Sequence, residues 1–165
     1  KKLKQEKNLM WYFVVRFLTA TGARVSELIQ IKVEHVRIGY FDIYSKGGKV
    51  RRLFIPKRLR DEAGVWFEET QQTTGYIFRN RFGERITTRG IAQQLKDHAE
   101  RYGLNTNVVY PHSFRHRYAQ NFLEAFNDIA LLADLMGHES IETTRIYLRR
   151  TASEQQAIVD KVITW

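Results

Sequence analysis

The sequence contains no cysteine, only two prolines and no apolar run that approaches the length of a membrane span. Without a thiol the chain can form neither a disulfide nor a thiolate zinc site. A helix needs roughly 20 apolar residues to cross a bilayer, and the lysine-rich start of the chain lacks the apolar stretch of a signal peptide. These absences argue against a disulfide scaffold and a helical membrane protein, and they predict a soluble cytoplasmic protein.

The chain is strongly basic, with a formal net charge of +9 and a pI of about 9.9. Such a charge attracts polyanions, of which nucleic acid is the commonest, although many ordinary basic enzymes share it. A length of 165 residues with 43% hydrophobic content suits one core. We therefore expect a single domain over residues 1–165. Because the first residue is not methionine, we also expect a fragment from which an upstream domain is missing.

Apolar periodicity and glycine stops predict a mainly α fold with one small antiparallel β-hairpin, an α+β class. The hairpin is expected at Gly47-Gly48, since this dipeptide supplies the positive φ of a tight turn. We predict strands at residues 36–45 and 49–55, and helices at residues 2–19, 25–31, 56–71, 88–102, 111–126, 129–136, 140–148 and 151–162.

Four residues of the last third have types that suit attack on a phosphodiester: His112, Arg115, His138 and Tyr147. An arginine fork can clamp a phosphate, a histidine can move a proton near neutral pH, and a tyrosine oxygen can become a covalent nucleophile. His112 and Arg115 are three residues apart on a predicted helix, so they project from nearly the same side. His138 follows Gly137, outside the preceding helix, where its side chain can face a ligand.

Basic residues also gather in the first third. Arg24 lies at a predicted turn before a helix, where the helix dipole disfavours a cation, and this position suggests a ligand. Lys46 precedes Gly47-Gly48 at the expected hairpin tip. The stretch from there to residue 60 has no acidic residue and seven basic ones, namely Lys46, Lys49, Arg51, Arg52, Lys57, Arg58 and Arg60. A β-ribbon of this charge could enter or straddle a DNA groove.

Each of these features also has a plainer interpretation. Arg24 could pair with Glu27, the basic run could be a solvated face, and His138 could simply cap a helix. Tyrosine is ordinarily a half-buried packing residue. His116 is expected to make a structural hydrogen bond, and Arg117 to contact a phosphate or solvent. Metal binding is disfavoured, because the i, i+4 histidine pair lacks the intervening glutamate of a metalloprotease helix and an obvious third ligand.

Taken in order, the motifs resemble the catalytic domain of the tyrosine recombinase (phage-type integrase) family. The resemblance covers residues 21–147. Four segments carry it: Thr-Gly-x-Arg-x-Ser-Glu-Leu, Lys-Gly-x-Lys, His-x-x-Arg-His, and Leu-Met-Gly-His nine residues before a tyrosine. Ser45 departs from the pattern, since glycine is common before the lysine, and this leaves Lys46 favoured over Lys49 without excluding the latter.

The resemblance implies a constellation of Arg24, Lys46, His112, Arg115, His138 and Tyr147. The two arginines and His138 would bind the non-bridging oxygens of the scissile phosphate, and His112 is the candidate acceptor for the tyrosine proton. Lys46 would protonate the leaving 5′ oxygen, and the product would be a 3′-phosphotyrosyl link. No metal or nucleotide cofactor would be required. DNA contacts are expected from Lys49, Arg51, Arg52 and Arg117.

The function that the resemblance implies is site-specific DNA recombination for a mobile element in a prokaryotic cell, close to the nucleoid. Its partner would be double-stranded DNA, with directionality or DNA-bending proteins as further candidates. The terminal helix, with Ile158, Val162 and Trp165 on one side, could pack in cis or could dock on a neighbouring protomer of a tetramer. A non-catalytic DNA-binding regulator and a type IB topoisomerase stay open as alternatives.

Overall fold

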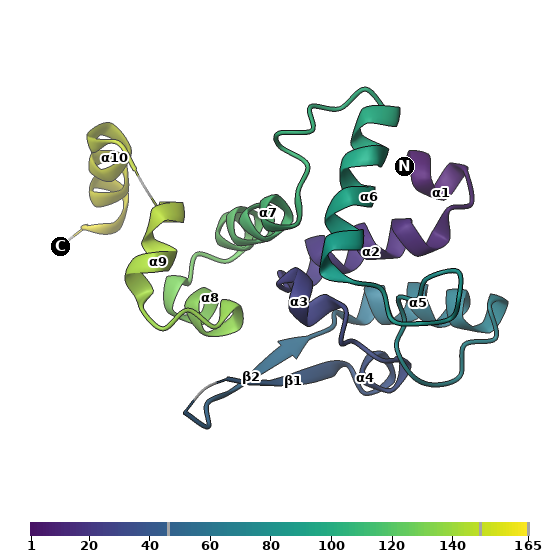
Figure 1. Ribbon diagram of the computed structural model, residues 1–165. Helices are drawn as coiled ribbons and strands as arrows, with labels where there is room; N and C mark the ends of the chain where they lie inside the picture. Colours follow the sequence, from purple (N-terminus) through teal and green to yellow (C-terminus); the bar gives the residue numbers. More distant parts are fainter. Residues whose placement is uncertain (46, 149, 165) are drawn as a thin grey trace.

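The computed structural model describes residues 1–45, 47–148 and 150–164. These residues are mainly helical, and the one two-stranded sheet among them lies along the lower edge of the molecule in Figure 1. The elements are α1 Lys2–Gln5, α2 Leu9–Thr21, α3 Val25–Leu28, α4 Val33–Ile38, β1 Tyr40–Tyr44, β2 Val50–Phe54, α5 Lys57–Glu69, α6 Thr88–Arg101, α7 Pro111–Ala125, α8 Ile129–Met136, α9 Ile141–Arg145, the 3-10 turn η1 Ile146–Leu148 and α10 Ala152–Val162. The mainly α architecture with a small antiparallel hairpin is the one predicted.

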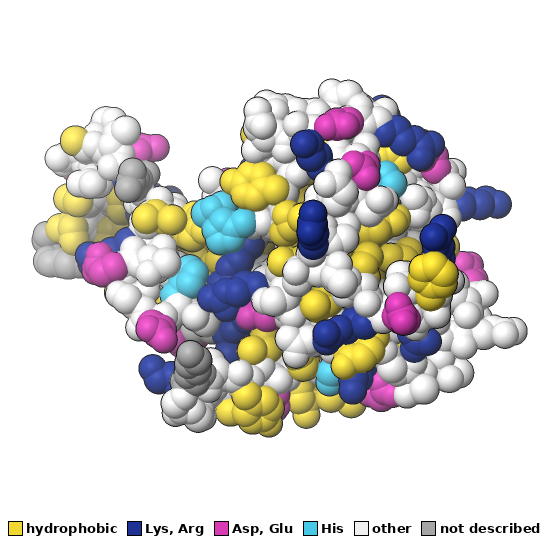
Figure 2. Space-filling model, in the orientation of Figure 1, with side chains coloured by type: hydrophobic (Ala, Val, Ile, Leu, Met, Phe, Trp, Pro, Cys, Tyr) yellow, Lys and Arg dark blue, Asp and Glu magenta, His cyan; other side chains and the backbone are white. Residues whose placement is uncertain are grey.

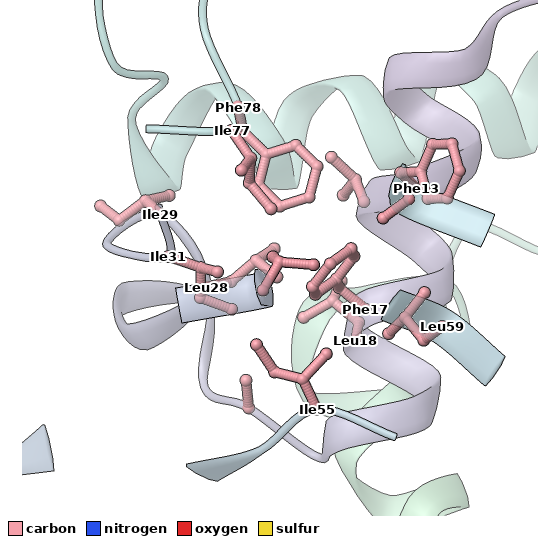
Figure 3. Packing of buried hydrophobic residues seen from close by; sticks show 14 of the residues in the cluster. Phe13, Phe17, Leu18, Leu28, Ile29, Ile31, Ile55, Leu59, Ile77 and Phe78 are labelled. Atoms are coloured by element: carbon pink, nitrogen blue, oxygen red, sulfur yellow. The ribbon is translucent and has the colours of Figure 1, made fainter. Parts of the chain in front are cut away.

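The main core lies among α2, α3, α5 and the segment that carries Ile77 and Phe78 (Figure 3). Phe13 and Phe17 are one turn apart on α2, which explains the four-residue apolar period of this stretch. Phe13 stacks on Trp66 of α5 at 4.6 Å between ring centroids, and Phe17 meets Phe78 edge to face at 5.7 Å. Aromatic pairs of this kind add specificity to the apolar burial.

The hairpin pairs Tyr40 with Phe54 and Tyr44 with Val50 in antiparallel register. Gly47 and Gly48 both have positive φ, as the turn required. The first expected strand was wrong over residues 36–38, which form the end of α4. Two local contacts favour the helix there: the His35 ring accepts a hydrogen bond from the Lys32 amide at 3.0 Å, and Gly39 ends the helix with φ 93°.

The first expected helix was also wrong in one respect, because residues 2–19 do not form one continuous helix. Lys7 adopts a φ of 56° between α1 and α2, and this conformation interrupts the helical hydrogen bonds. Gly22 ends α2 with φ 63°, as predicted. A Cβ at this glycine would lie 2.4 Å from the ring of Tyr118, so α7 packs directly against the end of α2.

A second, smaller cluster is formed by α7, α8 and η1. Its buried members are Ala119, Leu123, Leu132 and Met136, against which Tyr147 packs. Helix α10 stands apart from both clusters, at the yellow end of the chain (Figure 1), and none of its described residues is buried. In the described part of the chain, no helix is long and apolar enough to cross a membrane.

Candidate active site

Arg115 lies on the inner face of α7 and is 2% exposed. Its Nη1 donates to the carbonyl of Gly22 at 2.5 Å, and its Nη2 donates to the carbonyl of Met136. Gly22 is two residues before Arg24, and Met136 is two residues before His138. The guanidinium is therefore held between the two chain segments that carry these other candidates.

Arg24 is the N-cap residue of α3 and keeps 46% of its side chain exposed. Its backbone amide donates to Glu27 Oε2 at 2.7 Å, and its Nη1 pairs with Glu27 Oε1 at 2.9 Å. The pairing of Arg24 with Glu27 agrees with a structural role for this arginine. Arg24 also lines a cleft together with His138, which agrees with a role in ligand binding. A carboxylate at the third residue of the helix makes an arginine tolerable at the N-terminus.

The cleft has a volume of about 890 Å³ and is lined by α3, the hairpin and the end of α8. Its lining residues are Arg24, Ser45, Lys49, Val50, Arg51, Arg52, Phe54, Leu131, Asp134, Leu135, Gly137, His138, Glu139 and Thr143. Figure 2 shows lysine, arginine and histidine side chains gathered in the hollow between α8 and α9 on one side and α3 on the other. Such a concentration of positive charge in a hollow favours a phosphate.

His138 follows Gly137, whose φ of 65° turns the chain out of α8. The backbone amide of His138 closes the helix end by donating to Ala133 at 3.0 Å. Nδ1 lies 2.6 Å from the hydroxyl oxygen of Thr144, which is fully buried in α9. This contact fixes the ring by one nitrogen and leaves Nε2 to address the cleft.

Tyr147 is half-buried in η1, and its hydroxyl oxygen lies 2.6 Å from Nδ1 of His116. The phenol donates this hydrogen bond when the imidazole carries its proton on Nε2. The His112 ring stands nearly perpendicular to that of His116, with 4.3 Å between ring centroids. The hydrogen bond predicted for His116 is therefore present, and its partner is the candidate nucleophile.

Burial and mutual repulsion perturb the charged groups of this region. Burial, followed by the charge of Arg24, lowers the pKa of Arg115 from 12.5 to about 10. Burial lowers the pKa of His112, helped by His116 and then by Arg115 and Arg24. Burial and then the neighbouring arginines lower the pKa of His138. Burial raises the pKa of Tyr147, while the charge of Arg115 opposes that rise. Arg24, His112, Arg115 and His138 therefore lie within electrostatic reach of one another, and Tyr147 lies within reach of Arg115.

The structure thus brings together Arg24, His112, Arg115, His138 and Tyr147, although only Arg24 and His138 line the cleft itself. Lys46 lies outside the described residues. Of the predicted DNA contacts, Lys49 and Arg117 are exposed, and Arg52 is half-exposed beside Asp42, which it grips through two hydrogen bonds of 2.8 and 2.9 Å. Arg51 differs, because its guanidinium faces inward.

Two polar contacts of this region were not predicted from the sequence, namely the pairing of Glu27 with Arg51 and the contact of Thr144 with His138. Glu27 is a 5% exposed carboxylate that pairs with Arg24 and Arg51. Its burial raises its pKa, but the hydrogen bonds from the two arginines outweigh this and hold the pKa below its ordinary value. Thr144 fixes His138. The position of Glu27, three residues after a helix cap, indicates its pairing with Arg24. Nothing in the sequence marks Thr144 as buried.

Comparisons with known proteins agree with this arrangement. A search of curated proteins finds the tyrosine recombinase XerA of Pyrococcus furiosus, 32% identical over 90% of this chain and 53% of the relative. It also finds the tyrosine recombinase XerD of Staphylococcus epidermidis, 30% identical over 86% of this chain and 50% of the relative. The chain therefore spans about half the length of these curated relatives.

Solved structures share the fold. The crystal structure of a XerA recombinase matches with a TM-score of 0.75 at 23% identity, over 97% of this chain and 58% of that one. The Tn1549 transposon integrase in complex with a circular intermediate DNA matches with a TM-score of 0.74 at 15% identity, over 92% of this chain and 58% of that one. The model of the phage integrase family matches residues 2–154, and the chain accordingly belongs to this family of tyrosine recombinases.

Proposed function

We propose that this domain catalyses site-specific DNA strand cleavage and rejoining through a 3′-phosphotyrosyl intermediate. The observation that carries the proposal is the grouping of two arginines, two histidines and one tyrosine, drawn from α3, α7, η1 and the end of α8, around one basic hollow. Family membership and the names of the relatives, which are tyrosine recombinases, support the same activity.

The arginines and His138 bind the non-bridging oxygens of the scissile phosphate. Arg115 engages one N–H of each Nη with a carbonyl, so three of its five N–H groups stay available. Arg24, which lines the cleft, supplies a second guanidinium. Charge that grows on the phosphoryl oxygens in the transition state is then met by donors already in place, which is the largest kind of catalytic contribution.

Tyr147 supplies the nucleophile. Its oxygen bonds to phosphorus, its proton passes to His112, and the bond between phosphorus and the 5′ oxygen breaks. The lowered pKa of His112 keeps the imidazole neutral and able to accept that proton. Before DNA arrives, His116 holds the phenol, so the tyrosine leaves this contact as it moves to attack.

Lys46 donates a proton to the departing 5′ oxygen, in keeping with its place in the sequence between the two strands. The phosphotyrosyl link preserves the phosphodiester energy, and a different 5′ hydroxyl can attack it to rejoin the strands. We infer that no cofactor takes part, since each proton and each bond has a donor and an acceptor within this set.

The substrate is double-stranded DNA, and Lys49, Arg52 and Arg117 contact its phosphates. Contacts to phosphates position a protein without reading the base sequence. Because they release counterions from the DNA, binding should weaken steeply as the salt concentration rises. The likeness to the Tn1549 transposon integrase supports a role in moving a mobile element. The protein would then act at the nucleoid of a prokaryotic cell, with directionality or DNA-bending proteins and an upstream core-binding domain as partners.

Helix α10 provides the contact between protomers of a tetramer on DNA. Ile158 is 39% exposed and Val162 is 55% exposed, and they lie four residues apart on one face of a helix that buries none of its described residues. No described residue of the chain covers this apolar face, which suits it to a second copy. Trp165, the third residue expected on it, lies outside the described residues. Replacing both residues by serine should abolish higher-order complexes on DNA in native mass spectrometry.

The proposal is tested with full-length protein and a nicked cognate site, whose cleavage releases a short fragment and traps the covalent complex. Tyr147→Phe should abolish the complex. Tyr102→Phe is the matched control, because it also removes a hydroxyl that makes a hydrogen bond, in this case to Glu6 at 2.8 Å. Trapping that persists in Tyr147→Phe would remove Tyr147 from the mechanism. Relaxation of plasmids without a cognate site would instead identify a topoisomerase.

A further inference from the structure

Arg51 is the one predicted DNA contact whose side chain turns into the protein. It belongs to β2, and 12% of the side chain is exposed. Nη1 donates to the carbonyl of Leu135 in α8 at 2.8 Å, and Nη2 pairs with Glu27 in α3. Among the residues that the structure describes, these are the only side-chain hydrogen bonds that join the hairpin strands to those two helices.

The end of α8 is shaped around the same side chain. A Cβ at Gly137 would lie 2.5 Å from both Cδ and Nε of Arg51, and the φ of 65° also disfavours any side chain there. Arg51 therefore packs on the backbone that precedes His138. Arg51 also pairs with the carboxylate of Glu27, which in turn pairs with Arg24.

The neighbouring arginine shows that this arrangement is specific to Arg51. Arg52 grips Asp42 of the partner strand, and its guanidinium lies 3.7 Å above the ring of Tyr40. Those contacts stay within the hairpin, and they stiffen it without attaching it to the helices. On the other face of the strand, Leu53 is buried in the main core, and Arg51, two residues nearer the loop, makes the hydrogen bonds to α3 and α8.

We propose that Arg51 is a positioning residue, which fixes the hairpin against α3 and α8 so that the acid on the hairpin loop meets the leaving oxygen. The inference rests on the proposed function, in which Lys46 is that acid. Arg24 and His138 have further anchors in Glu27 and Thr144. The buried Leu53 holds the base of the hairpin in the core, whereas Arg51 ties the end nearer the loop to α3 and α8. Loss of the tether should thus impair protonation of the leaving group more than binding of the phosphate.

The test uses Arg51→Met in the full-length protein, since methionine keeps an unbranched apolar stem and removes the donors. Without DNA, hydrogen exchange of the amides of residues 40–54 should become on the order of tenfold faster. On a nicked site, the cleavage rate at saturating DNA should fall on the order of 100-fold, as expected for a catalytic group displaced by about 1 Å.

A second substrate separates positioning of the acid from a general structural effect. If sulfur replaces the bridging 5′ oxygen, the leaving group is a thiolate with a conjugate-acid pKa of about 8.5, which departs without a proton. On this substrate Arg51→Met should cleave at a rate within about threefold of the unmodified protein.

Arg16→Met is the matched control, because Arg16 also joins two elements, α2 and α5, through hydrogen bonds of 3.1 and 3.4 Å to Glu62. It should leave hairpin exchange and the cleavage rate on both substrates unchanged. Unchanged hairpin exchange in Arg51→Met would overturn the tether. Equal loss on the oxygen and sulfur substrates would overturn its link to the acid. If the unmodified protein forms no covalent complex through Tyr147, the proposed function fails, and exchange alone decides whether Arg51 fixes the hairpin.

Discussion

Replacement of Arg115 tests how a buried cation is accommodated at the centre of the site. Burial lowers its pKa from 12.5 to about 10, which corresponds to roughly 3 kcal/mol by which the surroundings disfavour the charged form. Against this, two hydrogen bonds from a charged donor to the carbonyls of Gly22 and Met136 contribute about 1.5–3 kcal/mol each. Together the two bonds contribute about 3–6 kcal/mol, so they offset the cost of the buried cation and exceed it by roughly 0–3 kcal/mol.

The balance predicts an unusual order of stability for two substitutions. Arg115→Met removes the charge together with the donors, and Glu27 keeps Arg24 and Arg51 as partners, so the loss should be roughly 0–3 kcal/mol. Arg115→Lys keeps the charge, but a single ammonium cannot span two carbonyls on different helices. A buried cation without full compensation costs roughly 3–5 kcal/mol. The conservative change should therefore be the more damaging one.

Thermal unfolding followed by circular dichroism measures this order. At about 2–4 °C per kcal/mol for a domain of this size, the melting temperature should fall by at most about 12 °C for methionine and should fall further for lysine. Arg117→Met, at an exposed position on the same helix, should leave it unchanged. A lysine variant as stable as the unmodified protein, or more stable than the methionine variant, would refute this account of the buried guanidinium.

Three further outcomes are expected. Burial and then the nearby arginines lower the pKa of His138, and a bound phosphate would offset the charge of those arginines. DNA binding should therefore take up protons and should tighten as the pH falls from about 8 to about 6. Calorimetry in two buffers of different ionisation enthalpy measures the uptake, and an absence of uptake would contradict the placement of His138 at the phosphate. His116→Phe should remove the hydrogen bond to Tyr147, which contributes about 1 kcal/mol, and should thereby speed hydrogen exchange in α9 and η1. His112→Phe should instead slow cleavage and leave hydrogen exchange in α9 and η1 unchanged. Lys49→Gln should reduce the slope of log affinity against log salt by about 0.9 if this lysine contacts a phosphate, and an unchanged slope would exclude the contact.

Much of the fold could be predicted because its strongest features are local. The apolar period of residues 9–21 and the glycine that follows fix α2, and Gly137 fixes the end of α8 in the same way. The prediction failed at residues 36–38 because Val36 and Ile38 alternate as in a strand. The cap by His35 and the positive φ of Gly39 decided for a helix there.

The site could be predicted only as a set of residue types in order. The acceptors of Arg115 are two backbone carbonyls, and no amino-acid type marks a carbonyl that a distant side chain will reach. The inward turn of Arg51 was equally hidden, since a basic run on a strand gives no indication of which arginine meets a carboxylate. Side-chain identity restricts the chemistry, but the tertiary structure assigns the partners.

The two carbonyls that hold Arg115 have a property that accounts for the burial of this charge. Both belong to helix C-termini, Gly22 at the end of α2 and Met136 at the end of α8, where the last carbonyls lack partners within the helix. Each such end carries a partial charge of about −0.5. Two helix ends that converge on one guanidinium therefore offset about one positive charge before any phosphate arrives. Arg115 can thus stay protonated and oriented without solvent, and in the proposed mechanism the scissile phosphate meets a cation whose position is already fixed by the fold.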